Sequence, residues 1–390
     1  MKFDFDKVVC RKDSNCAKWD ILGKAFGNEN AIALWVADMD FEVDPSIREA
    51  IEKRLSHEVF GYTFTPDSYY DAVISWMKKR HDWDVKKEWI KFTPGVVPGI
   101  NYIIGAFTKP GDEVIVQTPV YHQFFQVIKN NGCEIVDSPL INEEGKYTID
   151  FKDFEDKITD KTKMFLLCSP HNPIGRVWSQ EELRKLAEIC LRHNILIVSD
   201  EIHSDLVFSK HKHLVISTLS KDIEDISIIC TAPNKTFNIA GLHTANIMIP
   251  NEELRNKFSE HLQKLCISGP TIFGAIAQEA AYSKGEEWYE DLMEYLRGNI
   301  DFAVDFIQKR IPKLKVQYPE GTYLLWVDFS DLGFEGEELY EKLISEAGVV
   351  LNKGGIFGEG YECFQRINVG TRRAIVEEAL EKIEKFVNGL

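Results

Sequence analysis

The segment Ser179–Glu201, SQEELRKLAEICLRHNILIVSDE, decides the fold class of this chain. Its first half places apolar residues at helical spacing. Ser179 followed by Glu182 is the pattern of a capping box, so we expect a helix to begin there. Its second half, ILIVSDE, is a short apolar run that ends in Asp200 and is typical of a buried strand. A helix followed at once by such a strand indicates a parallel α/β sheet.

The same alternation continues along the chain in both directions. Other apolar runs of strand length lie between helix-like stretches: DEVIVQTP (112–119), CEIVDSP (133–139), KMFLLCSP (163–170) and SIICTAP (227–233). We therefore predict an α/β fold with a mainly parallel sheet flanked by helices. Ligands of such sheets gather outside the carboxyl ends of the strands, so the polar residues that follow these runs are candidates for a site.

The pattern changes beyond about residue 285. A long charged helix is expected at 286–310, a strand-like stretch at 316–329, a helix at 336–348 and a terminal helix from about Ala374. This order indicates a smaller α+β domain. We predict a large domain of residues 46–285 and a small domain formed by residues 1–45 and 286–390.

Composition limits the possible functions. The 390 residues are 44% hydrophobic and 12% aromatic, which is enough for a large core, and the net charge of -16 disfavours nucleic acid as a partner. The N-terminus has no apolar signal region and no segment approaches eighteen uninterrupted apolar residues, so we expect a cytoplasmic protein without a membrane partner.

The cysteines and histidines give little support to a disulfide framework or a metal site. The eight cysteines are scattered without a C-x-x-C pair, and we interpret them as reduced core thiols. His211 and His213 lie in a lysine-flanked stretch without an apparent carboxylate partner, which is typical of a solvated loop. We therefore expect no metal ion.

Four polar residues that follow the strand-like runs could act together in one reaction. In chain order they are Tyr121, Asn172, Asp200 and Lys235. A lysine that bonds a carbonyl cofactor needs partial desolvation to lower its pKa, and a pyridine ring that serves as an electron sink needs a carboxylate at its nitrogen. Lys235 and Asp200 suit these two tasks, which indicates pyridoxal 5'-phosphate (PLP).

In this interpretation Lys235 bonds the aldehyde of PLP, Asp200 pairs with the ring nitrogen, Tyr121 covers the ring and Asn172 binds its phenolic oxygen. The turn TPGVVPGI would offer the amides of Val96 and Val97 to the phosphate. Each of these residues alone has an ordinary structural explanation. A lysine after a strand is commonly a surface residue, an aspartate at a strand end is commonly a helix cap, and Asn-Pro is commonly a turn. The order and spacing of the whole set favour the cofactor.

Several motifs carry a resemblance to a known family. They are LWVADMDF, FGYTF, TPGVVPGI, SPHNPIGRVW, SDEIHSDLVF, NKTFNIAGL and RINVGTRR. With them the chain resembles, over essentially its whole length, the fold-type I PLP enzymes of the class I/II aminotransferase superfamily, and within it the cystathionine beta-lyase branch of the MalY/PatB type. The resemblance implies an aspartate aminotransferase-like fold with a seven-stranded sheet in the large domain.

The resemblance also implies roles for residues that spacing does not single out. It makes Tyr62 a contact to the cofactor phosphate of a second subunit, and therefore implies a homodimer. It makes Arg366 the clamp for the substrate α-carboxylate, a task that suits a planar guanidinium. A structural salt bridge is the alternative for Arg366. For Trp35, substrate contact and core packing are both open.

The sequence departs from the wider aminotransferase pattern near the cofactor. His203 stands where many aminotransferases have a tyrosine, His243 where they have a phosphate-binding arginine, and Ala232 where they have a hydroxyl. We expect His203 to contact the cofactor, and Thr231, Asn234 or backbone amides to supply the missing phosphate contact. Asp38 and Asp40 resemble a carboxylate pair, but turn or interface hydrogen bonding explains them equally well, and we do not assign them to catalysis.

The resemblance favours a carbon–sulfur β-lyase that cleaves cystathionine or another cysteine S-conjugate to a thiol, pyruvate and ammonia. An aminotransferase is the main alternative, because the same residues serve both reactions. A non-catalytic PLP-binding regulatory domain is the third. In transcription factors such a domain is fused to a DNA-binding arm, and no helix-turn-helix pattern is evident here.

Overall fold

The strand-like runs of the sequence become neighbouring strands of one sheet. The structure is a computed structural model that describes residues 1–208 and 210–390. In the sheet order β2-β10-β9-β8-β7-β3-β4, the pairs from β9 to β4 are all parallel. These strands are β3 (Glu113–Val116), β4 (Glu134–Asp137), β7 (Thr162–Cys168), β8 (Leu196–Asp200) and β9 (Ser227–Thr231). The predicted α/β class with a mainly parallel, seven-stranded sheet is confirmed.

Two strands complete the sheet beyond the five runs quoted above. They are β2 (Ile90–Thr93) and β10 (Ala245–Met248), and β10 pairs antiparallel with both β2 and β9. Each is four residues long, and neither was identified in the sequence as an apolar run. Because β10 follows Lys235 and pairs back along β9, it fixes the lysine turn at the carboxyl edge of the sheet.

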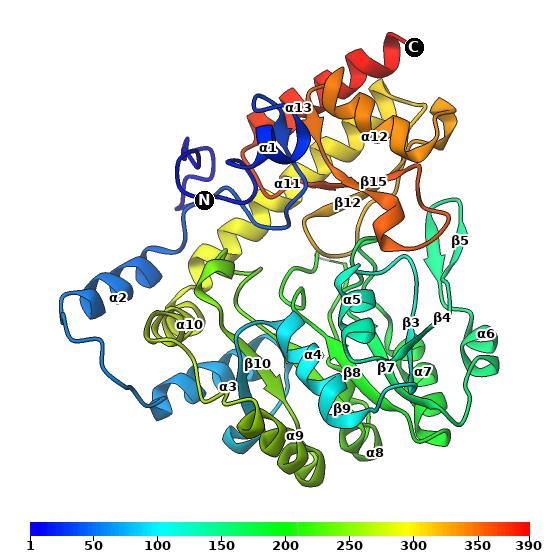
Figure 1. Cartoon of the computed structure of the whole chain (residues 1–390). Helices are drawn as coiled ribbons and strands as arrows, with labels where there is room; N and C mark the ends of the chain where they lie inside the picture. The colour runs from blue at the N-terminus through cyan, green and yellow to red at the C-terminus, as the bar shows by residue number, and fades with distance from the viewer. Residues whose placement is uncertain (209) are drawn as a thin grey trace.

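Helices cover both faces of the sheet (Figure 1). Successive strand residues point to opposite faces, so Val114 and Val116 pack in one core cluster while Ile115 packs in another. The first cluster includes α4 (Val96–Phe107), α5 (Gln123–Asn130) and α9 (Glu252–Lys264), and the second includes α3 (Asp67–His81), α7 (Gln180–Arg192) and α10 (Ile272–Lys284). The predicted capping box is present at the start of α7, between Ser179 and Glu182.

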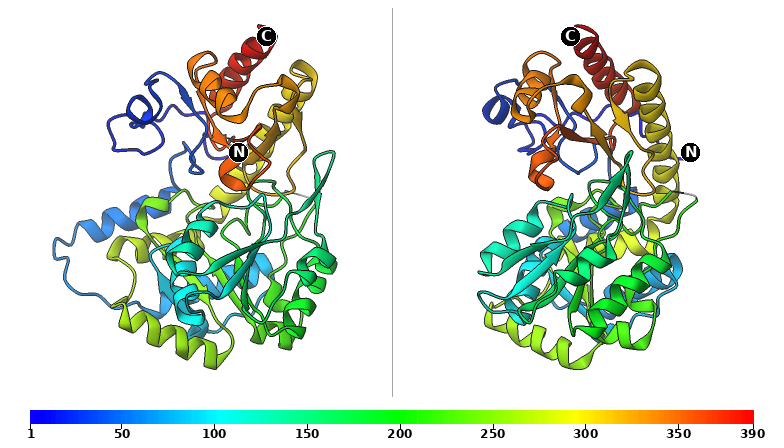
Figure 2. Two further views of the ribbon diagram at one scale, coloured as in Figure 1. Left: turned by 45° about the vertical axis from the view of Figure 1, so that its right-hand side comes forward. Right: turned by 90° about the vertical axis from the view of Figure 1, so that its right-hand side faces the viewer.

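A second, antiparallel sheet lies in the C-terminal part of the chain, above the large sheet in both views of Figure 2. Its strands are β11 (Lys315–Val316), β12 (Leu324–Asp328), β15 (Phe364–Asn368) and β14 (Asn352–Lys353). The N-terminal strand β1 (Ile32–Ala33) pairs in parallel with β13 (Val349–Val350), so both ends of the chain meet here. The helices of this part are α1 (Leu22–Phe26), α11 (Glu286–Arg310), α12 (Gly336–Ser345) and α13 (Arg373–Asn388).

The strand expected at 316–329 is only partly correct. Between Val316 and Leu324 the chain leaves the sheet, and Gly321 forms an isolated bridge with Val207 of the large-sheet region. A Cβ at Gly321 would lie 2.9 Å from the carbonyl oxygen of Leu206, so this close backbone approach requires glycine. Gln317 and Tyr318 at the start of this turn are exposed, whereas Thr322 and Tyr323 at its end are buried.

The remaining elements surround these two sheets. Helix α2 (Pro45–Leu55) packs against α10, and α11 begins directly after α10 at Gly285. The division at 45/46 and 285/286 stays a prediction of the domain boundaries. Further short elements are β5 (Ile141–Glu143), β6 (Lys146–Thr148), α6 (Phe151–Asp156), α8 (Lys221–Asp225), and the 3₁₀ turns η1 (Lys87–Trp89), η2 (Ile216–Thr218), η3 (Ala240–Leu242), η4 (Ser330–Leu332) and η5 (Gly354–Phe357).

Two expectations about single residues need correction. His211 is exposed as expected, but His213 is buried and its Nε2 lies 2.8 Å from Oε2 of Glu201. The carboxylate partner comes from the end of β8, so the stretch around 213 folds back onto the sheet. All eight cysteines are free, yet Cys10 and Cys266 are exposed rather than in the core. In the described part of the chain, no helix has the length and apolar character needed to cross a membrane.

Candidate active site

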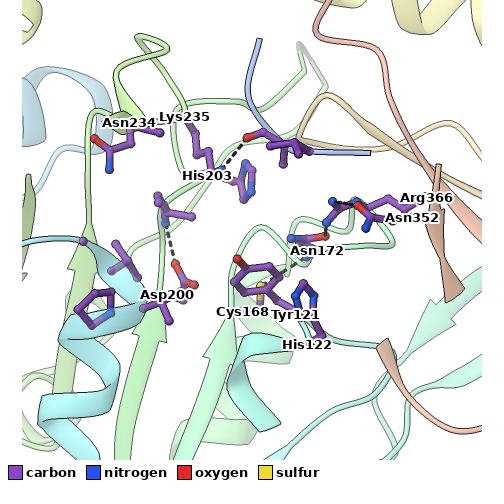
Figure 3. A pocket seen from close by; sticks show the side chains of 18 of the residues that line it. Tyr121, His122, Cys168, Asn172, Asp200, His203, Asn234, Lys235, Asn352 and Arg366 are labelled. Carbon is purple, nitrogen blue, oxygen red and sulfur yellow. Dashed lines mark hydrogen bonds between the residues drawn. The ribbon is translucent and has the colours of Figure 1, made fainter. Parts of the chain in front are cut away.

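A cavity of about 640 Å³ opens at the carboxyl ends of the central strands. It collects residues from both sheets, and Figure 3 shows the polar side chains that face it. The predicted site residues around it are Trp35, Val96, Val97, Tyr121, Asn172, Asp200, His203, Lys235 and Arg366. Thr231 and Tyr62 are the predicted residues that do not line it. The edge of the sheet where the strands end therefore brings together nearly the whole predicted set.

Lys235 lies in the turn after β9 with its amine directed into the cavity (Figure 3). Its Nζ donates a hydrogen bond to the carbonyl oxygen of Ala37 at 2.6 Å. Burial and the charge of Arg366 together lower the pKa of Lys235 to about 8, against the opposing charges of Asp38 and Asp200. The next residue, Thr236, donates from Oγ1 to Oδ2 of Asp205 at 2.8 Å and so anchors the turn.

Asp200 is the last residue of β8 and is buried at the floor of the cavity. Its Oδ1 accepts the backbone N–H of Ile202 at 3.1 Å. Burial raises the pKa of Asp200 to about 7, while the bond from Ile202 and the charge of Lys235 lower it. A buried carboxylate without a bonded cation gains most from a protonated nitrogen placed against it.

Another part of the cavity wall is formed by the start of helix α4. The N-cap Gly95 has no side chain to cap the helix, so the amides of Val96 and Val97 are open toward the cavity. Nearby, Oγ1 of Thr231 and Oδ1 of Asn234 are buried without a hydrogen-bond partner. His243 also lines this end, with Nδ1 3.3 Å from the carbonyl oxygen of Pro94. Free amides at a helix start are a binding site for an anion.

Arg366, from β15, forms the far wall and is buried. Its guanidinium donates to Oδ1 of Asn172 at 3.0 Å, to the carbonyl oxygen of Trp35 at 3.0 Å, and to Oδ1 of Asn352. Burial lowers the pKa of Arg366 to about 10. It forms no ion pair within the described residues, so its charge is available to a carboxylate ligand, and the salt bridge considered as an alternative is not formed.

Tyr121, His203 and Trp35 complete the walls. Tyr121 lies between Asn172 and Asp200 in Figure 3. His203 is buried, and burial together with the charges of Lys235 and Arg366 holds its pKa well below the usual range. The ring of Trp35 packs edge-on against Phe26, with 5.1 Å between the ring centroids, and Trp35 also lines the cavity. The residue therefore contributes both to core packing and to the site.

Asp38 and Asp40 have structural partners. Arg11 pairs with both carboxylates at 2.7 Å, and Lys18 lies 2.8 Å from Asp40. The side chain of Lys18 is fully buried, so this cluster ties residues 11–18 to the segment that forms one wall of the cavity. Neither aspartate lines the cavity itself.

Several lining residues were not identified from the sequence: Ala37, His122, Cys168, Asn352 and Ile356. His122 and Cys168 lie at strand ends next to predicted residues, so the strand-end rule could have included them. Asn352 and Ile356 come from β14 and η5 in the other sheet, and no local pattern places them here. Ala37 contributes only its carbonyl oxygen, which any residue could supply.

Tyr62 lies in an irregular segment, residues 57–64, between α2 and α3. Its side chain is fully exposed and does not line its own chain's cavity. Val59, Phe60 and Phe64 in the same segment are also exposed. The segment projects from the body as the loop beyond α2 in Figure 1.

Comparisons with known proteins agree with this arrangement. Residues 29–383 match the family Aminotransferase class I and II. The chain is 44% identical to cystathionine beta-lyase PatB of Bacillus subtilis over 98% of its length and 99% of that protein. Its fold matches the PLP-bound structure of a proposed aminotransferase from Clostridium difficile with a TM-score of 0.97, at 45% identity and 99% and 100% coverage of the two chains.

A second solved structure is also similar. The PLP-bound C-S lyase of Staphylococcus hominis, in its form with the inhibitor L-cycloserine, gives a TM-score of 0.93 at 34% identity, covering 99% of this chain and 98% of that one. Family match and sequence identity both extend over nearly the entire chain. The chain belongs to the aminotransferase class I and II family.

Proposed function

We propose that this protein is a PLP-dependent carbon–sulfur β-lyase that converts cysteine S-conjugates, cystathionine among them, to a thiol, pyruvate and ammonia. The observation that carries the proposal is the convergence of Lys235, Asp200 and Arg366 on one cavity. An amine of lowered pKa, a buried carboxylate and an unpaired guanidinium are the groups this chemistry needs. The similarity to cystathionine beta-lyase PatB supports the choice of reaction.

The residues of the cavity fit PLP. It offers an anion site at Val96 and Val97 and a buried carboxylate at Asp200, which match the phosphate and the ring nitrogen. Asn234 also lines the cavity, and the N–H groups of its side-chain amide can donate to a phosphate. We assign the aldehyde to Lys235, the phenolic oxygen to Asn172, and the two faces of the ring to Tyr121 and His203.

When bound, PLP supplies an electron sink conjugated to the α-carbon of the substrate. Lys235 has a pKa of about 8, so a large share of its amine is neutral near pH 8 and can remove the α-proton as a general base. Arg366 holds the α-carboxylate through its planar fork and orients the α-hydrogen toward Lys235. Burial of the site removes competing water from both groups.

The overall reaction balances without a further reactant except water. The α-proton leaves to Lys235, the bond between the β-carbon and sulfur breaks, and the electron pair departs with sulfur as a thiolate. Lys235, then protonated, lies beside the departing thiolate and can return a proton to it. Hydrolysis of the remaining three-carbon unit consumes one water and yields pyruvate and ammonia.

An aminotransferase is the second candidate, because the same residues perform its first half. The similarity to the proposed aminotransferase of Clostridium difficile supports it. Lys235 delivers the proton that it removes to different atoms in the two reactions. In the lyase reaction the substrate loses its sulfur substituent. In the aminotransferase reaction the substrate keeps this substituent, and its amino group is transferred to a 2-oxo acid.

The experiment that separates them uses the purified protein with PLP and L-cystathionine, with and without an added 2-oxo acid. For a lyase, pyruvate, free thiol and ammonia form in equal amounts and independently of the 2-oxo acid. Amino transfer that requires the 2-oxo acid would favour the aminotransferase. Binding of PLP without either product would favour a regulatory role. Lys235→Ala is the inactive control.

We extend the proposal to assembly and location. The exposed apolar side chains of residues 57–64 support a homodimer in which Tyr62 reaches the neighbouring phosphate site, since such a patch gains by burial. The absence of any disulfide among the eight cysteines supports a cytoplasmic location. Sedimentation of the wild type and of Tyr62→Ser tests the homodimer, and cell fractionation tests the cytoplasmic location.

A further inference from the structure

A buried carboxylate lies beside the lysine turn but outside the cavity. Asp205 belongs to the turn after β8, its side chain is 5% exposed, and it does not line the cavity. Its Oδ2 accepts a hydrogen bond from the hydroxyl of Thr236, the neighbour of Lys235, at 2.8 Å. Asp205 contacts neither substrate nor cofactor in the proposed arrangement, so any effect of its charge on the reaction passes through Thr236.

Three donors converge on the Asp205 carboxylate. Besides the hydroxyl of Thr236, Nε2 of His81 lies 2.9 Å from Oδ1, and Nε1 of Trp76 donates to the two oxygens at 3.1 and 3.2 Å. Burial raises the pKa of this carboxyl, but the hydrogen bond and charge of His81, followed by the bonds from Thr236 and Trp76, bring it below the ordinary value. An ionised carboxylate only accepts hydrogen bonds, so Nε2 of His81 carries a proton toward it.

A second buried pair of a carboxylate and a histidine adjoins the first. Nε2 of His213 lies 2.8 Å from Oε2 of Glu201, and the ring of His213 meets the ring of His81 edge-on at 5.5 Å between centroids. Glu201 directly follows Asp200 in the chain. The second pair therefore adjoins the carboxylate of the cavity, as the first pair adjoins the lysine turn.

Folding stability alone does not account for Asp205. Replacing a buried ionic group and its partner by apolar residues of similar volume is often neutral or stabilising. His81 and Trp76 both belong to α3, so Asp205 also holds that helix. The hydroxyl of Thr236 is the contact that leads to the lysine turn instead. A role confined to α3 and a role in positioning Lys235 therefore differ in what the loss of this one hydroxyl does.

We propose that Asp205, held by His81, is a positioning residue for Lys235 and acts through the hydroxyl of Thr236. The inference rests on the proposed function for the task of Lys235, whose amine has to reach both the cofactor and the α-hydrogen of the substrate. A displacement of about 1 Å at such a group can cost a hundredfold in rate. The same contact keeps the amine buried, and burial is the main cause of the lowered pKa of Lys235.

Thr236→Val and Thr236→Ser are the matched variants, because valine has the shape of threonine without its hydroxyl and serine keeps the hydroxyl. The first measurement uses the cofactor-free protein. Acetic anhydride labels the neutral form of the Lys235 amine, and peptide mapping over a series of pH values gives the midpoint of labelling. We expect this midpoint to rise by about one pH unit or more in Thr236→Val, because a released turn exposes the amine to water. Thr236→Ser should match the wild type.

The second measurement is exchange of the α-hydrogen of L-alanine in deuterium oxide by the holoenzyme. L-alanine has no sulfur substituent, so the result does not depend on elimination. We expect the maximal rate of exchange to fall by roughly tenfold to a hundredfold in Thr236→Val. KM should change little, because the substrate clamp Arg366 is untouched. Thr236→Ser should recover most of the rate.

Thr244→Val controls for the loss of a buried threonine hydroxyl elsewhere in the protein. Oγ1 of Thr244 donates to Oε1 of Gln278 at 3.1 Å, and neither residue lines the cavity. This variant should unfold at a lower urea concentration and keep the wild-type labelling midpoint and exchange rate. If it changed both quantities as much as Thr236→Val does, general destabilisation would explain the effect and the proposal would be overturned.

Asp205→Asn tests whether the carboxylate acts through Thr236. An amide has one acceptor oxygen and turns its N–H groups toward the other donor, so it cannot serve both His81 and Thr236. The variant should raise the labelling midpoint as Thr236→Val does, and the double variant should be no worse than Thr236→Val, because both changes break the same link. Fully additive losses would refute this route. If Asp205→Asn does not fold, the two threonine variants decide alone.

The proposed function and this inference fail in different ways. If L-cystathionine yields no pyruvate while the labelling midpoint of Thr236→Val rises as expected, the lyase proposal is wrong and the positioning role stands. If the wild type releases pyruvate, thiol and ammonia but folded Thr236→Val keeps the wild-type midpoint and exchange rate, the lyase proposal stands and the positioning role is refuted.

Discussion

The guanidinium of Arg366 donates to the side-chain oxygen of Asn172 at 3.0 Å, across 194 residues of sequence. Asn172 lies in the loop after β7 of the large sheet, and Arg366 lies in β15 of the C-terminal sheet. The proposed carboxylate clamp and the proposed contact to the phenolic oxygen of PLP are therefore in direct contact. A change in one will alter the position of the other.

Asn172→Leu is expected to weaken substrate capture as well as cofactor binding. The leucine removes an acceptor from a buried charged group, a loss of roughly 1.5 to 3 kcal/mol. KM for the amino acid should rise by about tenfold or more, although Asn172 is assigned to the cofactor. Steady-state kinetics at saturating PLP provide the measurement. Asn352→Leu removes another acceptor of Arg366 and should raise KM in the same way. A KM equal to that of the wild type would mean that the contact does not position Arg366.

Lys235→Ala should abolish covalent attachment of PLP, because Lys235 is the one lysine that lines the cavity among the described residues. Treatment of the holoenzyme with borohydride, followed by peptide mapping, should place the label on the peptide that contains Lys235. Lys235→Arg retains the charge and should also remain unlabelled. A label on another lysine in the wild type would show that the assignment is wrong.

Arg366→Ala should lower kcat/KM by an amount that corresponds to a loss of roughly 2 to 5 kcal/mol in binding free energy, since it removes one partner of a buried, charge-assisted contact. Most of the loss should appear in KM. Arg366→Lys keeps the charge but loses the planar fork, so its activity should be intermediate. The measurement is kcat/KM of the wild type, Arg366→Ala and Arg366→Lys with one S-conjugate. A kcat/KM that is unchanged in Arg366→Ala would exclude Arg366 from the site.

Asp200→Asn should retain the covalent link at Lys235 but slow removal of the α-proton. A neutral amide cannot keep the ring nitrogen protonated in a buried site, so the loss of preorganised charge should cost about a hundredfold in rate. Exchange of the α-hydrogen for deuterium and release of pyruvate should fall together, and PLP affinity should fall less. Wild-type rates in the variant would indicate that Asp200 only ends its strand.

The raised pKa of Asp200 also predicts a pH dependence of stability in the cofactor-free protein. A folded-state pKa of about 7 exceeds the unfolded value near 3.9, so the folded state binds the proton more tightly between these pH values. The contribution of Asp200 to folding stability is then lost as pH rises toward 7, by at most about 4 kcal/mol.

Asp200→Asn removes that dependence. We expect the variant to gain stability relative to the wild type between pH 5 and pH 8, as measured by urea unfolding after removal of PLP. Asp205→Asn is the contrasting variant, because hydrogen bonds and the charge of His81 hold the pKa of Asp205 below its usual value despite burial. A constant difference between Asp200→Asn and the wild type across this range would contradict the burial effect.

The sequence predicts the half of the site that comes from strand ends. Tyr121, Asn172, Asp200 and Lys235 follow runs whose apolar pattern is strong, and parallel strands place their carboxyl ends on one edge. That rule needs no tertiary information. It also explains why His122 and Cys168 could have been included.

The other half depends on how two sheets meet, which no local pattern encodes. Asn352 and Ile356 come from short elements of the C-terminal sheet, and Ala37 takes part through a backbone oxygen. Arg366 was found only through family resemblance. The partner of His213 was missed because Glu201 lies twelve residues earlier in the chain, and the two meet only when His213 returns to the end of β8.

The short segment 35–38 has a consequence for the order in which the protein matures. Its carbonyl oxygens accept hydrogen bonds from Arg366, Lys235 and Asn368, and β1 just before it pairs with β13. On the ribosome this segment emerges first, and most of these donors emerge some three hundred residues later. At roughly 5 to 20 residues per second it waits for tens of seconds. Catalytic competence should therefore arise only after Arg366 and Asn368 have emerged, and nascent chains that stall before Arg366 should accumulate with a folded sheet but no functional pocket.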